Sequence, residues 1–449
     1  MGRLFGTDGA RGIANTEITS ELALKIGRAA AMVLTENASL RPKVLIGTDT
    51  RKSADMLSFA LASGLCSVGA DVLMLGVVPT PAVAFLVKEY CCDAGVMISA
   101  SHNPCEYNGI KIFQSNGYKL PDALEEKIEA IILDEVCIPP VVTGGKVGKV
   151  TYTQNAVNDY IKHVADTADT KFDGMKIALD CANGSASVTA EALFSLTGTD
   201  CVVINATPDG TNINDKCGST DIKALSEFVK ENSFDCGFAF DGDADRLLAV
   251  DRNGNIVDGD MLMAIIAKYL KAKNKLRGNT LVATVMSNMG LFEFCKLNGI
   301  KCEKTKVGDR YVLENMLENG YCIGGEQSGH LIFLDYATTG DGQLSAVQIL
   351  GIMRDTCKSL DELASEIEIF PQVLINVKVS SFGKHRLCED EDIRLAIEEA
   401  EKELGDNGRV LVRASGTEPL VRVMLEGKDK KQIEKLATMI AQIVEERLI

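Results

Sequence analysis

The 449-residue sequence predicts an α/β protein of three related domains, followed by a smaller α+β domain at the C-terminal end. One observation is an order of strand, helix, strand, helix, strand and polar loop that occurs three times along the chain. Strands that alternate with helices favour mixed, mostly parallel sheets covered by helices. The C-terminal segment has a different order of elements. We therefore expect four domains, with the boundaries 1–155, 156–255, 256–370 and 371–449.

The three copies share this order of elements more than they share residue identity. Each begins with a short apolar run that is typical of a buried strand. The first copy has strands at 43–47, 71–77 and 94–98, a helix at 54–68, and the polar segment 99–104. The second has strands at 176–179, 201–204 and 236–240, a helix at 187–196, and the polar segment 241–246. The third has strands at 280–284, 301–304 and 321–324, a helix at 291–297, and the polar segment 325–330.

The C-terminal segment predicts a strand, a helix, two strands and a last helix. The strands are expected at 373–379, 410–414 and 420–426, and the helices at 389–404 and 430–448. The last helix carries an apolar face at helical spacing, formed by Ile433, Leu436, Ile440, Ile443 and Val444. This order fits a small α+β domain.

Composition and charge exclude several classes of protein. Lys and Arg number 47 against 63 Asp and Glu, a net charge of −16, which argues against a broad nucleic-acid or anionic-membrane surface. The first twenty residues have no apolar stretch behind a basic one, so we do not expect a secretory signal, and no apolar run is long enough to span a membrane. Fourteen cysteines are scattered without a C-x-x-C pair, which favours buried thiols in a reducing compartment over disulfides or zinc. We expect a cytoplasmic protein.

The repeat also predicts where a ligand binds. Ligands of open α/β sheets bind beyond the carboxyl ends of the strands, and a polar, glycine-containing loop follows the corresponding strand in each copy. If the three copies pack face to face around a cleft, these loops meet there. A fourth loop, 413–422, is placed to close the cleft.

The second of these loops carries Asp241, Asp243 and Asp245 at alternate positions, with a glycine that allows a tight bend. Three carboxylates this close repel one another without a cation, and ligands that are all oxygen suit Mg²⁺ better than Zn²⁺. The alternative is a solvated acidic turn. An EF-hand is excluded because arginines stand where its glycine and glutamate are required. The neighbouring Arg246 offsets charge and is placed to reach a phosphate.

The first loop carries Ser101, a candidate nucleophile for a phosphoryl group that a metal at the aspartates would help to stabilise. Taken alone, its A-S-H-N-P segment is better explained by a turn that a proline stops. A Ser-His-Asp hydrolase is disfavoured because no G-x-S-x-G elbow surrounds the serine. Lys111 is a candidate general acid or base if its pKa is lowered, and otherwise a surface lysine on the next strand.

Three further loops are candidates for binding. The third repeat loop offers Glu326, Ser328 and His330 to sugar hydroxyls or an amine, or is a glycine-rich turn. The loop 413–417 with Arg422 has the composition of a phosphate clasp, or of a hairpin tip with exposed arginines. Residues 6–12 lack a dinucleotide fingerprint and are interpreted as a tight loop that places Arg11 near the cleft.

Five of these motifs together resemble the α-D-phosphohexomutase family. They are F-G-T-D-G-A-R-G, I-S-A-S-H-N-P, D-G-D-A-D-R, G-E-Q-S-G-H and R-A-S-G-T-E-P, and they occur in the family's order across essentially the whole chain. Each motif alone is weak or moderate, but the set is highly specific. Two departures are visible: Ala10 stands where valine is common, and Asp309 lies near the position of a histidine in relatives that act on mannose or glucose phosphates.

The resemblance implies four domains around a central cleft and a role for each loop. Ser101 would be the phosphoserine, and its phosphate would bind one Mg²⁺ together with Asp241, Asp243 and Asp245. Lys111, Arg11, His330 and Arg246 would serve catalysis, through proton transfer and electrostatic support. The positions that match sugar recognition are Glu326 and Ser328, and those that match the phosphate-binding loop are Arg413, Ser415, Gly416, Thr417 and Arg422.

The loop variants and the chain length are most similar to family members that interconvert glucosamine 6-phosphate and glucosamine 1-phosphate. The implied reaction passes through glucosamine 1,6-bisphosphate, with glucosamine or glucose 1,6-bisphosphate as primer, and would supply amino sugar for UDP-N-acetylglucosamine and cell-wall precursors. The alternatives are a mutase of mannose or glucose phosphates, a Mg²⁺-dependent sugar phosphatase, and an inactive sugar-phosphate-binding protein. The expected partners are sugar phosphates, a second copy of the chain in a homodimer, and a Ser/Thr kinase unless Ser101 autophosphorylates; nucleic acid and membrane are not expected.

Overall fold

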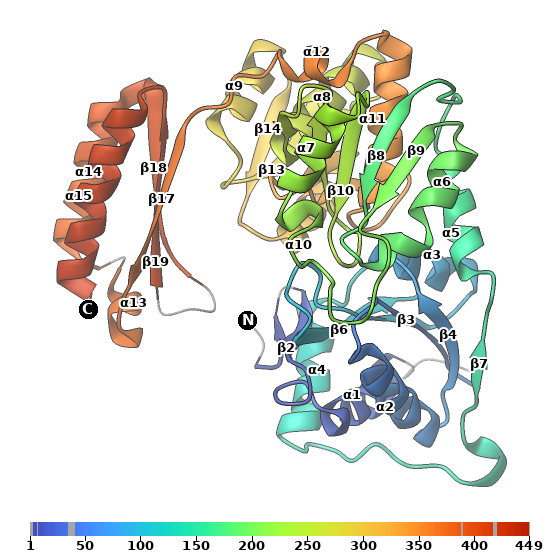
Figure 1. The fold of residues 1–449 in the computed structure, drawn as a ribbon. Coiled ribbons are helices and arrows are strands. Elements are labelled where there is room, and N and C mark those ends of the chain that lie inside the picture. Colours follow the sequence, from blue (N-terminus) through green and yellow to red (C-terminus); the bar gives the residue numbers. More distant parts are fainter. Residues whose placement is uncertain (1–2, 7, 35–40, 388, 416–419, 449) are drawn as a thin grey trace. The chain divides into compact units, whose positions relative to one another are not determined.

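The computed structural model describes residues 3–6, 8–34, 41–387, 389–415 and 420–448 (Figure 1). Its contacts divide the chain into two compact units, each of which is described by itself. The first unit consists of Met1–Met286 and Ile300–Glu366, and the second of Ser287–Gly299 and Ile367–Ile449. The first unit contains three of the four sheets formed by the described residues, and the second contains the fourth.

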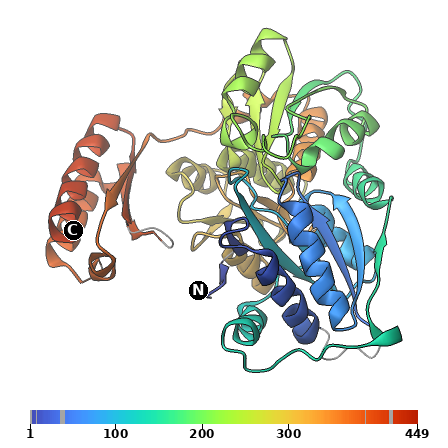
Figure 2. The ribbon, with the colours of Figure 1, turned by 60° about the horizontal axis from the view of Figure 1, so that its bottom comes forward.

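The N-terminal sheet has the strand order β1-β2-β6-β5-β3-β4-β7. Its strands are β1 (Phe5–Gly6), β2 (Gly9–Ile13), β3 (Lys43–Thr48), β4 (Asp71–Val77), β5 (Ala94–Ile98), β6 (Tyr107–Gln114) and β7 (Val150–Tyr152). Its helices are α1 (Ser20–Leu34), α2 (Ala54–Ser67), α3 (Thr80–Glu89) and α4 (Asp122–Leu133). Figure 2 shows α1 and α2 side by side against this sheet. They approach closely because Gly64 has no side chain: a Cβ atom there would lie 2.2 Å from the Leu24 carbonyl oxygen.

The middle sheet has the order β12-β11-β10-β8-β9. Its strands are β8 (Lys176–Asp180), β9 (Asp200–Ile204), β10 (Cys236–Phe240), β11 (Leu247–Asp251) and β12 (Ile256–Val257). The helices of this part are α5 (Ala156–Ala165), α6 (Ala190–Leu196) and α7 (Lys223–Glu231). Every residue of β10 is buried, as expected for a central strand with both faces covered.

The third sheet has the order β14-β13-β15-β16. Its strands are β13 (Thr280–Thr284), β14 (Lys301–Thr305), β15 (Ile323–Gly325) and β16 (Leu331–Phe333). The surrounding helices are α8 (Gly259–Ala272), α10 (Asp309–Asn319), α11 (Gly342–Thr356) and α12 (Leu360–Ala364). The helix predicted at 291–297 is α9 (Met289–Leu297), which belongs to the second unit.

The predicted repeat is confirmed by the strand orders. In each sheet the third strand of the copy pairs in parallel with the first, and the first with the second. A fourth strand then pairs antiparallel with the third, so the shared orders are β6-β5-β3-β4, β11-β10-β8-β9 and β16-β15-β13-β14. The polar loop of each copy is therefore the connection between its third and fourth strands, and all three loops occupy the same place in the topology.

The second unit contains an antiparallel sheet of the order β17-β19-β18. Its strands are β17 (Gln372–Lys378), β18 (Gly408–Ala414) and β19 (Leu420–Gly427), and its other helices are α13 (Ser381–Arg386), α14 (Glu391–Leu404) and α15 (Lys430–Leu448). The predicted strand and helix order of the C-terminal segment is confirmed. Helix α15 buries Ile433, Leu436, Ile440 and Val444 against this sheet, while Ile443 is partly buried.

The interpretation of residues 6–12 as a tight loop is wrong for most of its length. Residues Gly9–Ile13 form strand β2, which pairs antiparallel with β6 and brings Ala10 opposite Ile110. The segment shows no alternation of apolar and polar residues because it is rich in glycine, so its strand comes from pairing with β6 rather than from its own pattern. Arg11 lies on this strand.

Two predictions from composition can also be compared with the described residues. The thirteen cysteines among them are all free thiols. Each helix that the structure describes is too short or too polar to cross a membrane.

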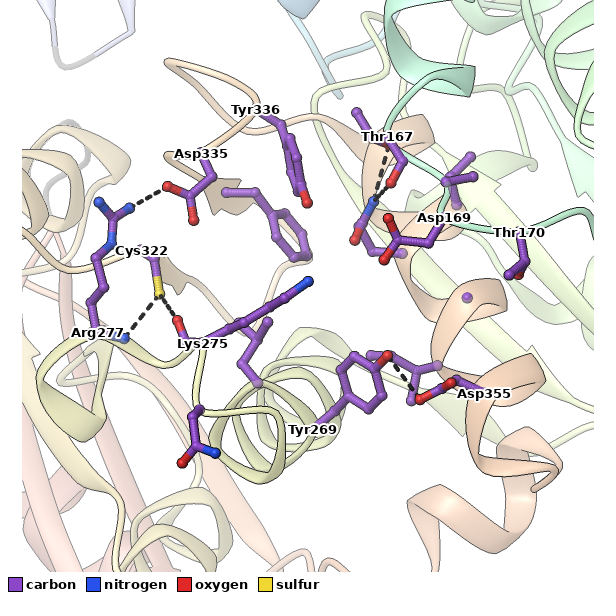
Figure 3. A pocket seen from close by; sticks show the side chains of 18 residues that line it. Thr167, Asp169, Thr170, Tyr269, Lys275, Arg277, Cys322, Asp335, Tyr336 and Asp355 are labelled. Atoms are coloured by element: carbon purple, nitrogen blue, oxygen red, sulfur yellow. Dashed lines mark hydrogen bonds and ion pairs between the residues drawn. The ribbon is translucent and has the colours of Figure 1, made fainter.

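A cavity of about 500 Å³ lies beside α8 and α11 and is lined in part by Tyr269, Lys275 and Tyr336 (Figure 3). None of the predicted site residues lines it.

The carboxylate that caps α11 makes the stability of the first unit depend on pH. Asp341 is buried, accepts hydrogen bonds from the Leu344 N–H and the Tyr160 hydroxyl at 2.9 Å, and burial raises its pKa to about 6. The folded state therefore holds this proton more tightly than the unfolded state, so the unfolding free energy falls as pH rises from about 4 to about 6, by up to about 1.4 kcal/mol per pH unit.

Asp341→Asn removes this titration, so the difference in Tm between variant and wild type is expected to change across that pH range and to be constant above it. Thermal unfolding of both proteins from pH 4 to 8 measures this. A difference in Tm that is the same at every pH would contradict it.

Candidate active site

The three polar loops of the repeats meet in the first unit, as the sequence analysis expected. Ser101 of the first loop donates a hydrogen bond through Oγ to Asp241 Oδ2 of the second, at 2.6 Å. His330 of the third loop lies with Nδ1 3.7 Å from Asp245 Oδ1. The first copy also reaches the second through Thr80, whose hydroxyl donates to Asp243 Oδ2 at 2.6 Å. The fourth loop belongs to the second unit, and its residues 416–419 lie outside the described residues.

Ser101 is held in an unusual backbone conformation. Its φ of +52° lies in the left-handed region, which a non-glycine residue adopts at a cost in energy that its surroundings must offset. The Ser101 carbonyl oxygen accepts hydrogen bonds from Arg51 Nη2 and Asn214 Nδ2, both at 2.9 Å. Arg51 is itself fully buried in an ion pair with Asp49 at 2.9 Å. These contacts direct the Ser101 hydroxyl toward the aspartate loop.

The aspartate loop approaches Ser101 closely because it contains a glycine. A Cβ atom at Gly242 would lie 2.6 Å from the Ser101 carbonyl oxygen, so any side chain there would separate the two loops. Gly242→Ala is therefore expected to lower kcat of the reaction proposed below strongly, with a smaller effect on Tm. The reason is that the added methyl group would move the Ser101 and Asp241 loops apart. Steady-state kinetics and thermal unfolding of this variant, with Gly351→Ala as control because a Cβ atom there meets open space, test this. Equal activity of the two variants would contradict it.

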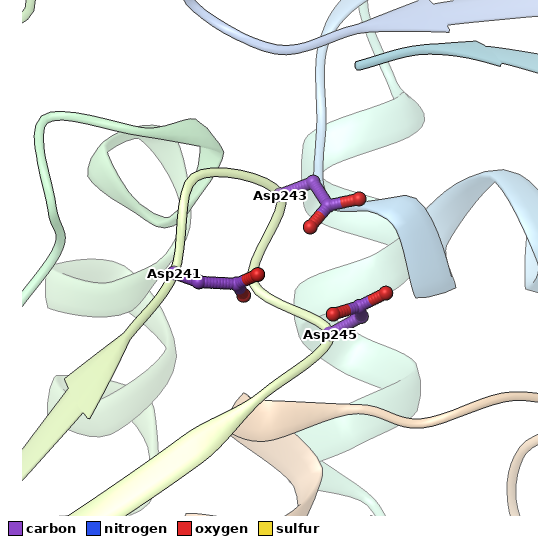
Figure 4. A group of neighbouring side chains, drawn as sticks. All are labelled: Asp241, Asp243 and Asp245. Carbon is purple, nitrogen blue, oxygen red and sulfur yellow. The ribbon is translucent and has the colours of Figure 1, made fainter. Parts of the chain in front are cut away.

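Asp241, Asp243 and Asp245 form a cluster that fits a metal ion (Figure 4). One ligand oxygen from each lies within 4.8 Å of the others, and all three residues are buried. Burial, Asp245 and Asp243 together raise the pKa of Asp241 well above its usual range. The two neighbouring carboxylates repel the charge on Asp241, and a cation would relieve this repulsion. Asp243 Oδ1 and Asp245 Oδ1 are buried without a hydrogen-bond partner. Oxygen atoms left over in this way are available as ligands to a hard divalent cation.

Lys111 on β6 is buried, with 1 % of its side chain exposed, so the surface-lysine alternative is wrong. Its Nζ donates to Asp243 Oδ2 at 2.8 Å and lies 3.0 Å from Asp8 Oδ2 and 3.6 Å from Asp245 Oδ2. Burial lowers the pKa of Lys111, but the three carboxylates outweigh burial and the pKa is raised. The three carboxylates therefore favour the charged form of Lys111, which places a cation beside the aspartate loop.

Two arginines flank the serine. Arg11 donates through Nη1 to Asn103 Oδ1 at 3.3 Å and pairs with Asp8. The Arg246 backbone N–H donates to Asp241 Oδ1 at 3.2 Å, and its guanidinium remains partly exposed. Burial lowers the pKa of Arg246, but the carboxylates of Asp241 and Asp245 outweigh burial, so the pKa is raised and the guanidinium stays charged. Both side chains are placed to contact an anion near Ser101.

Within the third loop, His330 is buried, whereas Glu326 and Ser328 are more accessible. His330 Nε2 accepts a hydrogen bond from the Gly340 N–H at 3.1 Å, which assigns the ring proton to Nδ1 on the side of Asp245. Burial lowers the pKa of His330, but Asp245 and Asp309 outweigh burial and raise it. Glu326 is partly buried and accepts from the Gly308 N–H at 3.1 Å, and Ser328 is exposed. Glu326 and Ser328 can thus offer oxygen atoms to a ligand.

The second unit places two predicted phosphate ligands opposite one another. Arg413 on β18 pairs in register with Arg422 on β19, so two like charges lie on neighbouring strands. Burial and then Arg422 lower the pKa of Arg413, and its Nε is buried without a hydrogen-bond partner. An anion between the two guanidinium groups would relieve this repulsion. Ser415 is buried and its N–H donates to the Leu420 carbonyl at 2.9 Å, while Gly416 and Thr417 lie outside the described residues.

Comparison with known families covers nearly the whole chain. Models of the phosphoglucomutase/phosphomannomutase family match as α/β/α domain I at residues 2–136, domain II at 158–254, domain III at 258–370 and the C-terminal domain at 374–443. The chain belongs to the phosphoglucomutase/phosphomannomutase family. This confirms the resemblance and the fold class predicted from the sequence.

Individual members of the family are similar over their full length. Proteins named phosphoglucosamine mutase from Ruminiclostridium cellulolyticum and Acetivibrio thermocellus are 58 % and 56 % identical, with 100 % of both chains covered in each case. A solved phosphoglucomutase/phosphomannomutase family protein from Burkholderia thailandensis has a TM-score of 0.82 at 24 % identity, covering 99 % of this chain and 98 % of the other. A solved protein from Thermus thermophilus named "putative phosphomannomutase" has a TM-score of 0.79 at 22 % identity, covering 98 % of each chain. At these identities the solved structures support the fold alone.

Several residues at this candidate site were missed by the sequence analysis. They are Asp8, Asp49, Arg51, Thr80, Lys119 and Asn214, and each contacts a predicted site residue or a partner of one. Asp8 had a signal, because it stands in the same short motif as Arg11. The others had none, because each is an ordinary polar residue whose partner lies far away in the sequence. Asp309, which the sequence analysis noted only as a departure, begins α10 and accepts from Lys119 Nζ at 2.6 Å.

Proposed function

We propose that this protein interconverts glucosamine 6-phosphate and glucosamine 1-phosphate through a phosphoserine at Ser101. The observation that carries the proposal is the Ser101 hydroxyl, 2.6 Å from Asp241 in a buried cluster of three aspartates. The choice of glucosamine is supported by relatives named phosphoglucosamine mutase that are more than half identical over the whole chain. The proposed reaction is an isomerisation in which the phosphoryl group changes position on the sugar.

The reaction requires two transfers of opposite direction at one serine. In the first, the bond between phosphorus and Ser101 Oγ breaks while a bond from the same phosphorus to O1 of glucosamine 6-phosphate forms, and Ser101 Oγ gains a proton in place of the one that O1 loses. The bisphosphate then turns over in the site. In the second, the bond from phosphorus to O6 breaks while Ser101 Oγ bonds to that phosphorus, and O6 gains a proton in place of the one that the Ser101 hydroxyl loses. Glucosamine 1-phosphate leaves and the phosphoserine is restored.

The side chains of the site supply charge and position in these steps. Lys111, Arg11 and Arg246 are fixed cations beside Ser101, where they stabilise the negative charge on the transferring phosphoryl oxygens. Glu326 and Ser328 bind the sugar hydroxyls, and His330 supports the site from the third loop. Arg413, Ser415, Gly416, Thr417 and Arg422 hold the phosphate that does not react. Since one clasp serves both orientations of the bisphosphate, positioning carries much of the catalysis.

The proposed cofactor is one Mg²⁺ ion held by Asp241, Asp243, Asp245 and the Ser101 phosphate. When bound, the ion neutralises charge that develops on the phosphoryl oxygens. We expect Mg²⁺ to raise the Tm of the dephosphorylated protein and EDTA to reverse this. The shift in Tm should be lost in Asp245→Asn, while Asp235→Asn serves as a control outside the cluster. A Mg²⁺ shift that survives Asp245→Asn would place the ion elsewhere.

A substrate panel distinguishes this proposal from its closest alternative, a mutase of mannose or glucose phosphates. Glucosamine, glucose and mannose 1-phosphates are compared by kcat/KM with the phosphorylated protein and a 1,6-bisphosphate. We expect glucosamine 1-phosphate to be preferred, and a clear preference for mannose 1-phosphate would overturn the choice. A phosphatase would instead release one inorganic phosphate for each sugar phosphate consumed. An inactive binding protein would turn over none of the three.

The phosphoserine also predicts a need for a primer. Protein treated with a phosphatase should be inactive until glucosamine or glucose 1,6-bisphosphate, a Ser/Thr kinase or autophosphorylation restores the phosphoryl group. Intact-protein mass spectrometry follows the gain of one phosphoryl group alongside activity. Full activity without that mass would contradict the proposal. A homodimer is proposed as the oligomeric state, which light scattering measures directly.

A further inference from the structure

Six side chains of the first unit lie in a closed ring beside the candidate site, which we call the charge ring: ion pairs join five of them, and His330 lies between the carboxylates of Asp309 and Asp245. Its members come from all three repeats and alternate between carboxylates and basic groups. The sequence around the ring is Lys111, Asp8, Lys119, Asp309, His330 and Asp245. In this order, the distances from side-chain nitrogen to carboxylate oxygen are 3.0, 2.6, 2.6, 3.6 and 3.7 Å, and the distance from Asp245 back to Lys111 is 3.6 Å. Lys119 makes both of the shortest contacts.

Lys119 joins two carboxylates that belong to different repeats. Its Nζ donates to Asp8 Oδ1 and to Asp309 Oδ2, each at 2.6 Å, and its side chain is 11 % exposed. The backbone is anchored as well, because Lys119 pairs with Phe113 in an isolated bridge at the end of β6, the strand that carries Lys111. The lysine is thus a fixed cation rather than a mobile surface charge.

Each carboxylate that Lys119 holds also contacts a residue of the proposed site. The other oxygen of Asp8 faces Lys111 Nζ at 3.0 Å and pairs with Arg11. Asp309 Oδ2 lies 3.6 Å from His330 Nε2. Without the ammonium between them, Asp8 and Asp309 would be two partly buried negative charges in close proximity. They would move apart, and each would displace the site residues that it contacts.

We propose that Lys119 is a positioning residue for phosphoryl transfer, which holds Asp8 and Asp309 together and through them fixes Lys111, Arg11 and His330 around Ser101. The proposal rests on the proposed function of this site. Lys119 acts through the two carboxylates and does not touch the reacting atoms. It therefore affects the rate of transfer more than the binding of the sugar phosphate, since Glu326 and Ser328, the residues proposed to bind the sugar, are not members of the charge ring.

The test compares Lys119→Met with the wild-type protein, using the sugar phosphate that the wild type turns over best. We expect kcat to fall about 100-fold, the effect typical of losing a residue that orients catalytic groups, with KM changed less than about threefold. Lys119→Arg keeps the charge and should recover to within about tenfold of the wild type. Lys127→Met, on the exposed side of α4, is the matched control and should leave kcat unchanged.

A double variant separates positioning from loss of fold. In Lys119→Met with Asp309→Asn, one of the two opposed carboxylates is neutral, so kcat should rise several-fold above that of Lys119→Met alone, although a second site residue has been changed. If Lys119→Met does not fold, the same comparison is made with Lys119→Gln. The proposal is overturned if kcat of the single variant stays within threefold of the wild type, if only KM changes, or if the double variant is the less active of the two. A wild-type protein that turns over no sugar phosphate would instead refute the proposed function.

Discussion

Ser101→Ala is expected to reduce mutase turnover by about 10⁴-fold or more, the range seen when a nucleophile is removed from an otherwise intact site. The hydroxyl is the only group of this residue that the proposed reaction uses, and alanine leaves its backbone contacts with Arg51, Asn214 and Ser99 in place. The protein should therefore fold with a Tm close to that of the wild type. It should also fail to gain a phosphoryl group from a 1,6-bisphosphate.

The measurements are steady-state kinetics, thermal unfolding and intact-protein mass spectrometry. Ser115→Ala, at an exposed position after β6, is the matched control and should retain full activity and phosphorylation. Normal turnover by Ser101→Ala would sink the phosphoserine mechanism. Loss of turnover with retained phosphorylation would place the phosphoryl group on another residue.

Lys111→Met should cost both activity and stability. The variant leaves Asp243, Asp8 and Asp245 facing one another without their common cation, and removing one partner of a buried ion pair destabilises a protein by about 3–5 kcal/mol. We expect a clear fall in Tm and a loss of kcat of about 10²–10³-fold, because a fixed charge beside the phosphoryl group is lost.

Bound Mg²⁺ separates the two effects. An ion at the aspartates would offset part of the uncompensated charge, so it should raise the Tm of Lys111→Met by more than it raises that of the wild type, without restoring kcat. Thermal unfolding with and without Mg²⁺ measures this, with Lys162→Met as a surface control. Wild-type kcat in Lys111→Met would show that the ammonium has no part in the reaction.

The local features of this chain were well predicted from sequence, because they depend on neighbours along the chain. The strands and helices of the C-terminal segment and the third-strand loops follow from apolar runs and their periodicity, and the structure confirms them. Asp241, Asp243 and Asp245 were found for the same reason: alternate positions in a tight turn bring carboxylates together whatever the rest of the fold does.

Features that depend on distant partners could not be predicted in this way. Lys111 has the sequence context of an ordinary strand lysine, and its burial follows from Asp8 and Asp243, which lie more than a hundred residues away on either side. Lys119 contacts Asp309 across 190 positions. The left-handed backbone of Ser101 also has no local signal, since the contacts that hold it come from Arg51 and Asn214.

Each of the three loops connects the third and fourth strands of its own sheet, so each can be exchanged as a separate segment. The third loop enters and leaves through the facing pair Gly325 and Leu331, so its five residues are clamped at both ends by one antiparallel ladder. Gly329 must be kept, because a Cβ atom there would lie 2.1 Å from the Leu247 carbonyl oxygen. If this loop recognises the sugar as proposed, grafting the segment from relatives with other sugar preferences would alter which hexose is accepted while the serine and aspartate loops stay unchanged. Because the same strand connection occurs three times, the loop proposed to select the sugar can change in evolution without changing the loops proposed to carry the phosphoryl transfer.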